Sequence, residues 1–231
     1  MADMTDTDQL RQKMLINVAW AQAVLAALIF IPAWSIAYWQ GWLYWLCAGA
    51  GMLWLSLDVA KNDPALAKRR AHAGPTAEHR PRQKLIQSFT SVFGIAIFIV
   101  SPLDYRFGWS SVPALLTVTA DAAIILGFVA IFLTFRENTF ASSIIEITPE
   151  QRVVDTGPYA RVRHPMYSGA LLIFLGSPLA LGSWWGLIPA TVVCGALVWR
   201  LIDEESVLRA ELPGYDAYTK TVRTRLVPGL W

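Results

Sequence analysis

The stretch from residue 14 to residue 38, MLINVAWAQAVLAALIFIPAWSIAY, decides the fold class of this chain. It is apolar and carries no charge, and an apolar helix needs roughly 20 residues to cross the hydrocarbon core of a bilayer. Residues 85–103 and 165–199 are also uncharged, and residues 107–135 contain a single charged residue, Asp121. This pattern predicts a polytopic helical membrane protein.

The composition of the whole chain agrees with a membrane protein. Of its 231 residues, 55% are hydrophobic and 16% are charged, and the mean hydropathy is +0.43. These values are too apolar for an ordinary soluble domain. The net charge of +2 is too small to indicate a nucleic-acid partner. We expect no cleavable signal peptide, because the N-terminus is acidic, and no obligate protein partner is evident.

We predict an all-α bundle of about six membrane helices, with the first turn at Gln40-Gly41. The uncharged segment 165–199 must hold two of them, because Gly182-Ser183-Trp184-Trp185-Gly186 interrupts it. The fifth helix is then short for a full span, so the last two should form a tight hairpin. A cofactor-binding loop and a C-terminal helix complete the prediction. The expected spans cover about residues 14–38, 41–60, 85–103, 112–135 and the two halves of 165–199.

The basic residues predict the orientation of the chain. Segment 61–84 has seven Lys or Arg residues against two acids, which places it in the cytoplasm by the positive-inside rule. Both termini and segment 136–164 would share that side. We expect 61–84 to be a solvated linker near anionic headgroups.

Residues 156–169, TGPYARVRHPMYSG, carry the features of a ligand site. They close a segment, 136–164, in which four basic residues balance four acidic ones. A helix that begins at Pro165 offers unpaired backbone N–H groups to a carboxylate. The aromatic faces of Tyr159 and Tyr167 attract a ligand cation. Such a pocket suits a zwitterion with a positively charged sulfur.

Arg200 and Glu204 supply the second half of the expected site. They are four residues apart, so they share one face of the last membrane helix. Ionisable side chains where a helix leaves the membrane need partners or a polar cavity. Alone the pair would read as a salt bridge that ends the helix, but beside the 156–169 motif it favours a site. Asp121, in the middle of an expected span, has either a functional or a structural role.

The motif within residues 156–169 and the group Arg200, Glu204 and Glu205 together resemble the isoprenylcysteine carboxyl methyltransferase family. The resemblance continues in Gly214-Tyr215, Tyr218, Val222, Arg225 and Pro228. Membrane phospholipid N-methyltransferases share the core of that family. The resemblance covers about residues 136–231. It implies an S-adenosylmethionine site inside the helical core, reached from the cytoplasm, without a Rossmann domain and without a metal. The chain would then divide into a hairpin with its basic loop, 1–84, and a methyltransferase core, 85–231, with the cofactor site in 136–231.

The resemblance also implies roles for individual residues. Arg200 matches the position that faces the methyl acceptor. Eukaryotic members usually have His where Gln151 stands. Residues 136–140 have no close counterpart in the prenylcysteine enzymes and lie where the acceptor should enter, so Arg136, Glu137 and Asn138 are expected to contact it. The expected cofactor-binding residues are Gln151, Arg152, Val153, Val154, Tyr159, His164, Pro165, Met166, Tyr167 and Glu204.

The expected reaction is a direct displacement at a sulfonium methyl group. A carboxylate or thiolate acceptor needs a counter-charge, which Arg200 can provide. An amine acceptor must lose a proton, which Glu205, Glu137 or Glu146 can accept. We therefore expect Arg200 and Glu205 to be catalytic. The acceptor is lipophilic or small: a prenylated thioether carboxylate, a phospholipid amine or a volatile thiol.

Two other functions fit part of the pattern. An NADPH-dependent membrane reductase of the sterol-reductase type has a related Arg-His…Tyr pattern in its C-terminal half. A non-catalytic membrane binding protein could retain the fold. The methyltransferase is favoured because Arg200, Glu204 and the Gly-Pro-Tyr turn occur together, whereas an inactive descendant should have lost one of them.

Overall fold

The computed structural model describes residues 6–71, 74, 76–78, 80–144, 147–148 and 150–231. All the regular elements of this described part are helices, which confirms the predicted all-α bundle. In chain order they are α1 (Asp6–Ala33), α2 (Trp39–Asn62), α3 (Pro64–Ala71), α4 (Pro81–Phe107), α5 (Ala114–Glu137), the 3-10 helix η1 (Gly157–Ala160), α6 (Pro165–Ala180), α7 (Leu187–Glu211) and α8 (Tyr215–Thr221).

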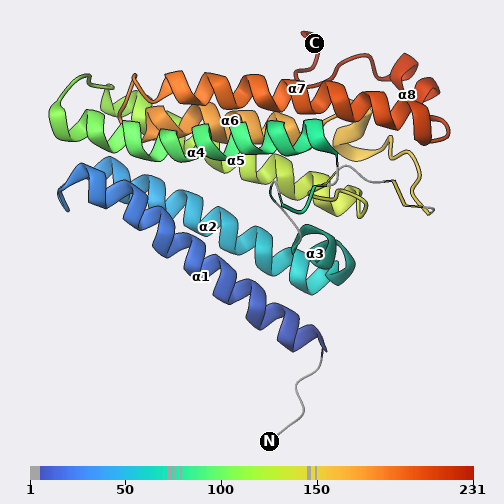
Figure 1. The fold of residues 1–231 in the computed structure, drawn as a ribbon, viewed down its shortest axis with the longest axis horizontal. Coiled ribbons are helices and arrows are strands. Elements are labelled where there is room, and N and C mark those ends of the chain that lie inside the picture. Colours follow the sequence, from blue (N-terminus) through green and yellow to red (C-terminus); the bar gives the residue numbers. More distant parts are fainter. Residues whose placement is uncertain (1–5, 72–73, 75, 79, 145–146, 149) are drawn as a thin grey trace, which may run out of the picture.

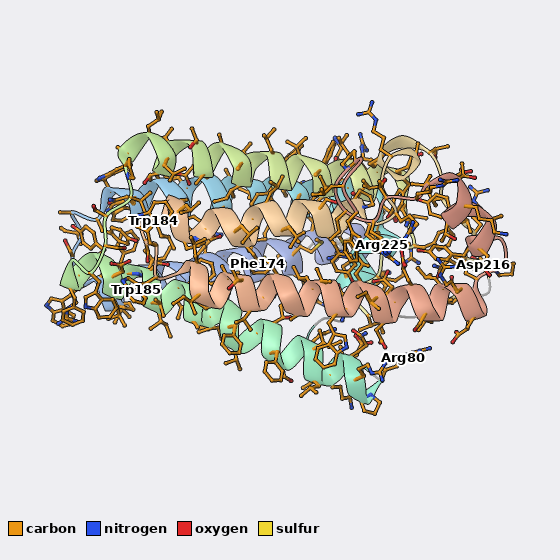
Figure 2. The ribbon with its side chains drawn as sticks, turned by 90° about the horizontal axis from the view of Figure 1, so that it is seen from above. Arg80, Phe174, Trp184, Trp185, Asp216 and Arg225 are labelled. Carbon is orange, nitrogen blue, oxygen red and sulfur yellow. The ribbon has the colours of Figure 1, made fainter. Side chains whose placement is uncertain are left out.

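The long helices run side by side, and the two ends of the bundle differ in character (Figure 1). One end gathers α3, η1 and α8, while the opposite end holds the short connections between helices. Trp184 and Trp185 lie at the end with the short connections, and Arg80 and Arg225 lie at the other (Figure 2). We refer to the end with α3 and α8 as the polar end.

Four helices in the described part of the chain are long and apolar enough to cross a membrane, namely α1, α2, α4 and α5. α6 is apolar but has only 16 residues. α7 has 25 residues, and its charged residues begin at Arg200. α6 packs against both α5 and α7. The short fifth helix of the prediction is therefore present, as one arm of a hairpin held between longer helices.

The turn between the first two helices lies earlier than expected. Trp34 has a left-handed φ of 52°, and the chain reverses over residues 34–38 rather than at Gln40-Gly41. Gly41 lies instead in the first turn of α2, where an added Cβ would come within 2.7 Å of Cδ1 of Tyr38. The glycine is needed for close packing of that ring and not for a turn.

The prediction of a solvated linker over residues 61–84 is wrong for the described part of that segment. Its α3 buries Leu66 and Ala67 in a cluster with Val59 and Phe135. The helical spacing explains this packing, because Leu66 and Arg70 are four residues apart and therefore lie on the same face of α3. Arg70 therefore also packs against the bundle, and its guanidinium carbon lies 4.3 Å from the centre of the Phe135 ring.

Two glycines bring α5 and α6 into backbone contact. A Cβ added to Gly127 would lie 2.7 Å from the carbonyl oxygen of Gly169, and one added to Gly169 would lie 2.6 Å from that of Gly127. Small residues at a helix crossing permit this approach in membrane bundles. The contact fixes the first turns of α6, which begins at Pro165 as predicted, against the C-terminal half of α5.

Candidate functional site

A cavity opens at the polar end between α6, α7, α8 and the segment 138–154. Its enclosed space is about 100 Å³, and the total with its open mouth is about 840 Å³. Of the residues expected to hold a cofactor, Pro165 does not line this first cavity and is instead buried in the first turn of α6. The others line it: Gln151, Arg152, Val153, Val154, Tyr159, His164, Met166, Tyr167 and Glu204.

A chain of hydrogen bonds crosses the inner wall of the first cavity. The hydroxyl of Tyr167 donates to Oε2 of Glu204 at 2.6 Å. The same hydroxyl accepts a bond from Nε of Arg200 at 3.0 Å. Because Tyr167 is on α6 while the other two residues are on α7, these bonds fix the two arms of the hairpin relative to each other. They also hold a carboxylate and a guanidinium on the cavity wall.

Arg200 has further partners that the sequence did not indicate. Its Nη1 donates to Oε1 of Gln83 at 2.9 Å and lies 3.3 Å from Oε2 of Glu78. Its Nη2 donates to the carbonyl of Ser143 at 2.9 Å. Gln87 also donates to Glu78, at 2.7 Å. Gln83 and Glu78 are 0% and 2% exposed, so the N-terminal half of the chain positions the proposed acceptor-facing arginine.

Glu205 lies behind the cavity wall and not on it. Its carboxylate accepts bonds from Nε of Arg163 at 2.7 Å and Nε of Arg225 at 3.0 Å, and lies 3.2 Å from Nε2 of His164. Burial alone would raise the pKa of Glu205, but the bonds from His164, Arg163 and Arg225 hold it well below its usual value. A carboxylate held in this way is a poor proton acceptor.

The same cluster joins the C-terminal tail to the cofactor loop. Arg163 donates through Nη1 to the carbonyls of Val222 and Arg223 at 2.8 and 2.7 Å. The backbone N–H of His164 donates to the carbonyl of Arg225 at 3.0 Å. Glu205 is thus the buried centre of a joint between α7, the start of α6 and the tail, and its position indicates a structural role.

Of the three residues in segment 136–138 that are expected to contact the acceptor, only Asn138 lines a cavity. Asn138 lines the first cavity and donates to the hydroxyl of Tyr159 at 2.9 Å. Arg136 and Glu137 line neither cavity described in this section. Arg136 lies 3.9 Å from Asp58 on α2, and Glu137 accepts a hydrogen bond from the Thr156 hydroxyl. Glu146, the third candidate base, lies outside the described residues.

A second, larger cavity adjoins the first. It contains about 1920 Å³ including its openings and lies between α1, α2, α3, α4, α5, α6 and α7. Its lining is mainly apolar, with residues such as Val18, Leu55, Phe135 and Phe174. Four residues line both cavities and form their shared wall: Ser142, Met166, Tyr167 and Arg200.

The first cavity has the chemistry that S-adenosylmethionine requires. Glu204 offers an anion for an α-amino group, and the rings of Tyr159 and Tyr218 offer faces for a purine or a sulfonium. Tyr215 also lines it, and its buried hydroxyl has no hydrogen-bond partner among the described residues. Burial raises the pKa of Tyr159 to about 12, so it remains a neutral phenol. An unpartnered buried hydroxyl in a cavity wall favours a polar ligand there.

Asp121 belongs to neither cavity. It is 3% exposed within α5, and neither of its carboxylate oxygens has a hydrogen-bond partner in the described part of the chain. The functional and structural alternatives for Asp121 both stay open, although it is absent from the lining of both cavities.

Comparison with known families agrees with the location of the site. The phospholipid methyltransferase family model matches residues 115–212. The match runs from the start of α5 to the residue after α7 and includes Tyr167, Arg200 and Glu204. It confirms, over these residues, the expected resemblance to integral-membrane methyltransferases. No curated protein matches the chain.

Proposed function

We propose that this membrane protein, whose residues 115–212 match phospholipid methyltransferases, transfers the methyl group of S-adenosylmethionine to an acceptor held in the neighbouring cavity. The observation that carries the proposal is the shared wall. Residues of the predicted cofactor motif and of the predicted acceptor side, which are far apart in the sequence, meet at Met166, Tyr167 and Arg200. Polar and apolar groups are mixed in the lining of the first cavity, the second cavity is mainly apolar, and the two adjoin only along a few side chains.

Each group of residues has a defined task in this proposal. When bound, S-adenosylmethionine supplies an electrophilic methyl group on a sulfonium. Glu204 binds the α-amino group of the cofactor, and the backbone of residues 151–154 lines the rest of its site. The hydroxyl of Tyr167 holds the side chains of Glu204 and Arg200 in fixed positions by hydrogen bonds to both. Arg200 faces the acceptor, and the surrounding helices exclude water. Alignment of two reactants in this way can lower the activation free energy by roughly 7–11 kcal/mol.

Arg200, and not Glu205, is the catalytic residue in this proposal. Glu205 is 4% exposed and is held by Arg163, His164 and Arg225, so it positions the loop rather than moving a proton. The polar end carries both the cofactor cavity and the basic segment 61–84. By the positive-inside rule this end faces the cytoplasm.

Calorimetric titration of the purified full chain with S-adenosylmethionine and, separately, with NADPH tests the proposal. We expect saturable binding of S-adenosylmethionine with one site per chain and no heat with NADPH. Binding of NADPH alone would instead establish the reductase alternative. Binding of neither compound would leave a non-catalytic protein as the better description. Mass spectrometry of products from methyl-labelled S-adenosylmethionine and membrane extract then identifies the acceptor.

A further inference from the structure

The carboxyl group of Asp121 is buried in α5, and the methyl-transfer site does not use it. Asp121 is 3% exposed and lies about 10 Å along the helix from Ala114, where α5 begins. Neither of its carboxylate oxygens has a hydrogen-bond partner among the described residues. An ionised carboxylate without a partner is costly inside an apolar bundle, so another species must neutralise it.

Another oxygen without a partner lies one turn earlier on the same helix. Thr117 is fully buried, and its Oγ1 forms no hydrogen bond within the described part of the chain. Residues four apart share a helix face, and helical side chains lean toward the N-terminus of their helix. The carboxylate of Asp121 therefore leans toward the Thr117 hydroxyl, and one face of α5 groups three buried oxygens.

The two helices that pack against this part of α5 add hydroxyl oxygens. The hydroxyls of Tyr44 on α2 and Ser177 on α6 lie 3.0 Å apart. Ser177 donates its own proton to a carbonyl one turn earlier in α6, at 2.7 Å, so Tyr44 is the donor of the pair. Tyr44 interacts electrostatically with Asp121. A Cβ added to Gly176, beside Ser177, would lie 3.3 Å from the carbonyl oxygen of Ala120, beside Asp121.

These helices offer no basic side chain that could neutralise Asp121. No Lys, Arg or His occurs in residues 39–60 of α2, 114–135 of α5 or 165–180 of α6. The titratable groups of α2 that interact with Asp121 are Tyr44 and Cys47, which are both weak acids. α6 has no titratable residue after Tyr167, which lies in its first turn. The neutralising species must therefore be a bound ligand.

A cation suits these oxygens better than a proton or a water molecule. A proton cancels the charge but binds to one oxygen only. A water molecule can donate hydrogen bonds but leaves the charge in place. A metal cation cancels the charge and is coordinated by several oxygens at once. Because a single carboxylate balances one positive charge, the ion should be monovalent, and the close packing at Gly176 favours a small one.

We propose that Asp121 and Thr117, together with the hydroxyls of Tyr44 and Ser177, form an intramembrane binding site for sodium. The site is separate from both cavities and does not depend on the proposed methyl transfer. The bound ion connects α5 with α2 and α6. It therefore stabilises the packing of the hairpin that carries the cofactor motif.

Thermal denaturation of the full chain in a nonionic detergent tests the site. Sodium chloride replaces choline chloride at constant ionic strength, and a ligand that binds only the folded chain raises the midpoint. We expect a saturable rise of about 3–6 °C when sodium is at about ten times its dissociation constant. Potassium should produce a smaller rise at the same concentration.

Three variants assign the effect to this site. Asp121→Asn keeps the shape of the side chain but removes its charge, and it should unfold cooperatively with a midpoint that sodium does not change. Thr117→Val removes one oxygen and should require about tenfold more sodium for the same rise. Asp58→Asn is the matched control, because Asp58 is a carboxylate on α2 that pairs with Arg136 and lines neither cavity. It should keep the full response.

Reaction with N,N′-dicyclohexylcarbodiimide, an apolar reagent for protonated carboxyl groups, adds a measurement that needs no variant. Sodium should slow the labelling of Asp121, as measured by mass spectrometry of the labelled peptide, whereas choline should not. A wild-type midpoint that does not respond to sodium overturns the proposal, as does labelling that sodium does not slow. A sodium response that persists in Asp121→Asn, or a larger response to potassium, also overturns it.

Discussion

The two cavities of this protein meet at a common wall but differ in almost every other respect. The first is formed by the C-terminal part of the chain, and polar and aromatic side chains dominate its lining. The second is formed largely by helices from both halves, and apolar side chains dominate its lining apart from Arg70 and Arg200. The proposed division of labour rests on this difference: the first cavity would hold the methyl donor and the apolar second cavity the acceptor.

The comparison also locates where the two sites depend on each other. Tyr167 and Arg200 line both cavities and are hydrogen-bonded at 3.0 Å. Glu204 lines only the first cavity, and Arg70 lines only the second. Substitutions at these last two positions should therefore affect one ligand each, whereas damage to the joint beneath the first cavity should affect the whole molecule.

The largest effect is expected from Glu205→Ala, which removes the buried carboxylate beneath the first cavity. Arg163 would then be left buried, 5% exposed, without its acid, and breaking a buried ion pair costs about 3–5 kcal/mol. The denaturation midpoint of the solubilised protein should fall sharply. Glu211→Ala on the same helix is the control, because its partner Arg80 is partly exposed and such pairs contribute at most about 1 kcal/mol.

Acidification tests the same joint without a substitution at its basic partners. The folded-state pKa of Glu205 lies below its usual value of 4.5. The stabilisation is therefore complete above the unfolded pKa and is lost as the pH falls toward the folded one. Glu205→Gln should abolish this part of the loss of stability below about pH 4, as measured by denaturation at pH 3 and pH 7. An unchanged acid dependence in the variant would assign the effect to other carboxylates.

A selective effect on the first cavity is expected from Glu204→Ala. Loss of a carboxylate that pairs with a cationic amine should weaken S-adenosylmethionine binding by roughly 10- to 100-fold. Calorimetry on the purified full chain measures this affinity. Retained cofactor affinity would remove Glu204 from the site.

The smallest effect is expected from Arg136→Ala. Arg136 lines neither cavity, and its side chain is half-exposed beside Asp58 at 3.9 Å. An exposed pair of this kind contributes about 0–1 kcal/mol to stability. Binding of S-adenosylmethionine should remain within about twofold of the wild type, which corresponds to less than about 0.5 kcal/mol. A large loss of this binding would show that the donor site reaches further along α5 than the first cavity does.

The sequence was informative where chemistry is concentrated in short motifs. The motif 156–169 and the pair Arg200 and Glu204 could be recognised from residue types and spacing, whereas the assignment of residues 151–154 to the cofactor came from the family resemblance. The bundle of apolar helices was equally predictable, because an uncharged apolar stretch long enough to cross a membrane is a strong signal of a membrane helix.

Glu78, Gln83 and Arg70 carried no comparable signal. Glu78 and Gln83 act through contacts with α7, more than 100 residues away, as in the Gln83–Arg200 pair with its separation of 117. Arg70 acts through contacts with Phe135, Ala141 and Met166, which are also distant in the sequence. The same holds for Glu205. Its acidity suggested a base, but the burial of its carboxylate among Arg163, His164 and Arg225 is set by the fold of the tail.

An experimental structure of the full chain with S-adenosylmethionine tests the division between the two cavities most directly. We predict that the cofactor occupies the first cavity, with its sulfonium methyl group at the wall formed by Met166, Tyr167 and Arg200 and directed toward the second cavity. A cofactor bound in the second cavity, or a methyl group directed toward solvent, would contradict the assignment of donor and acceptor sites.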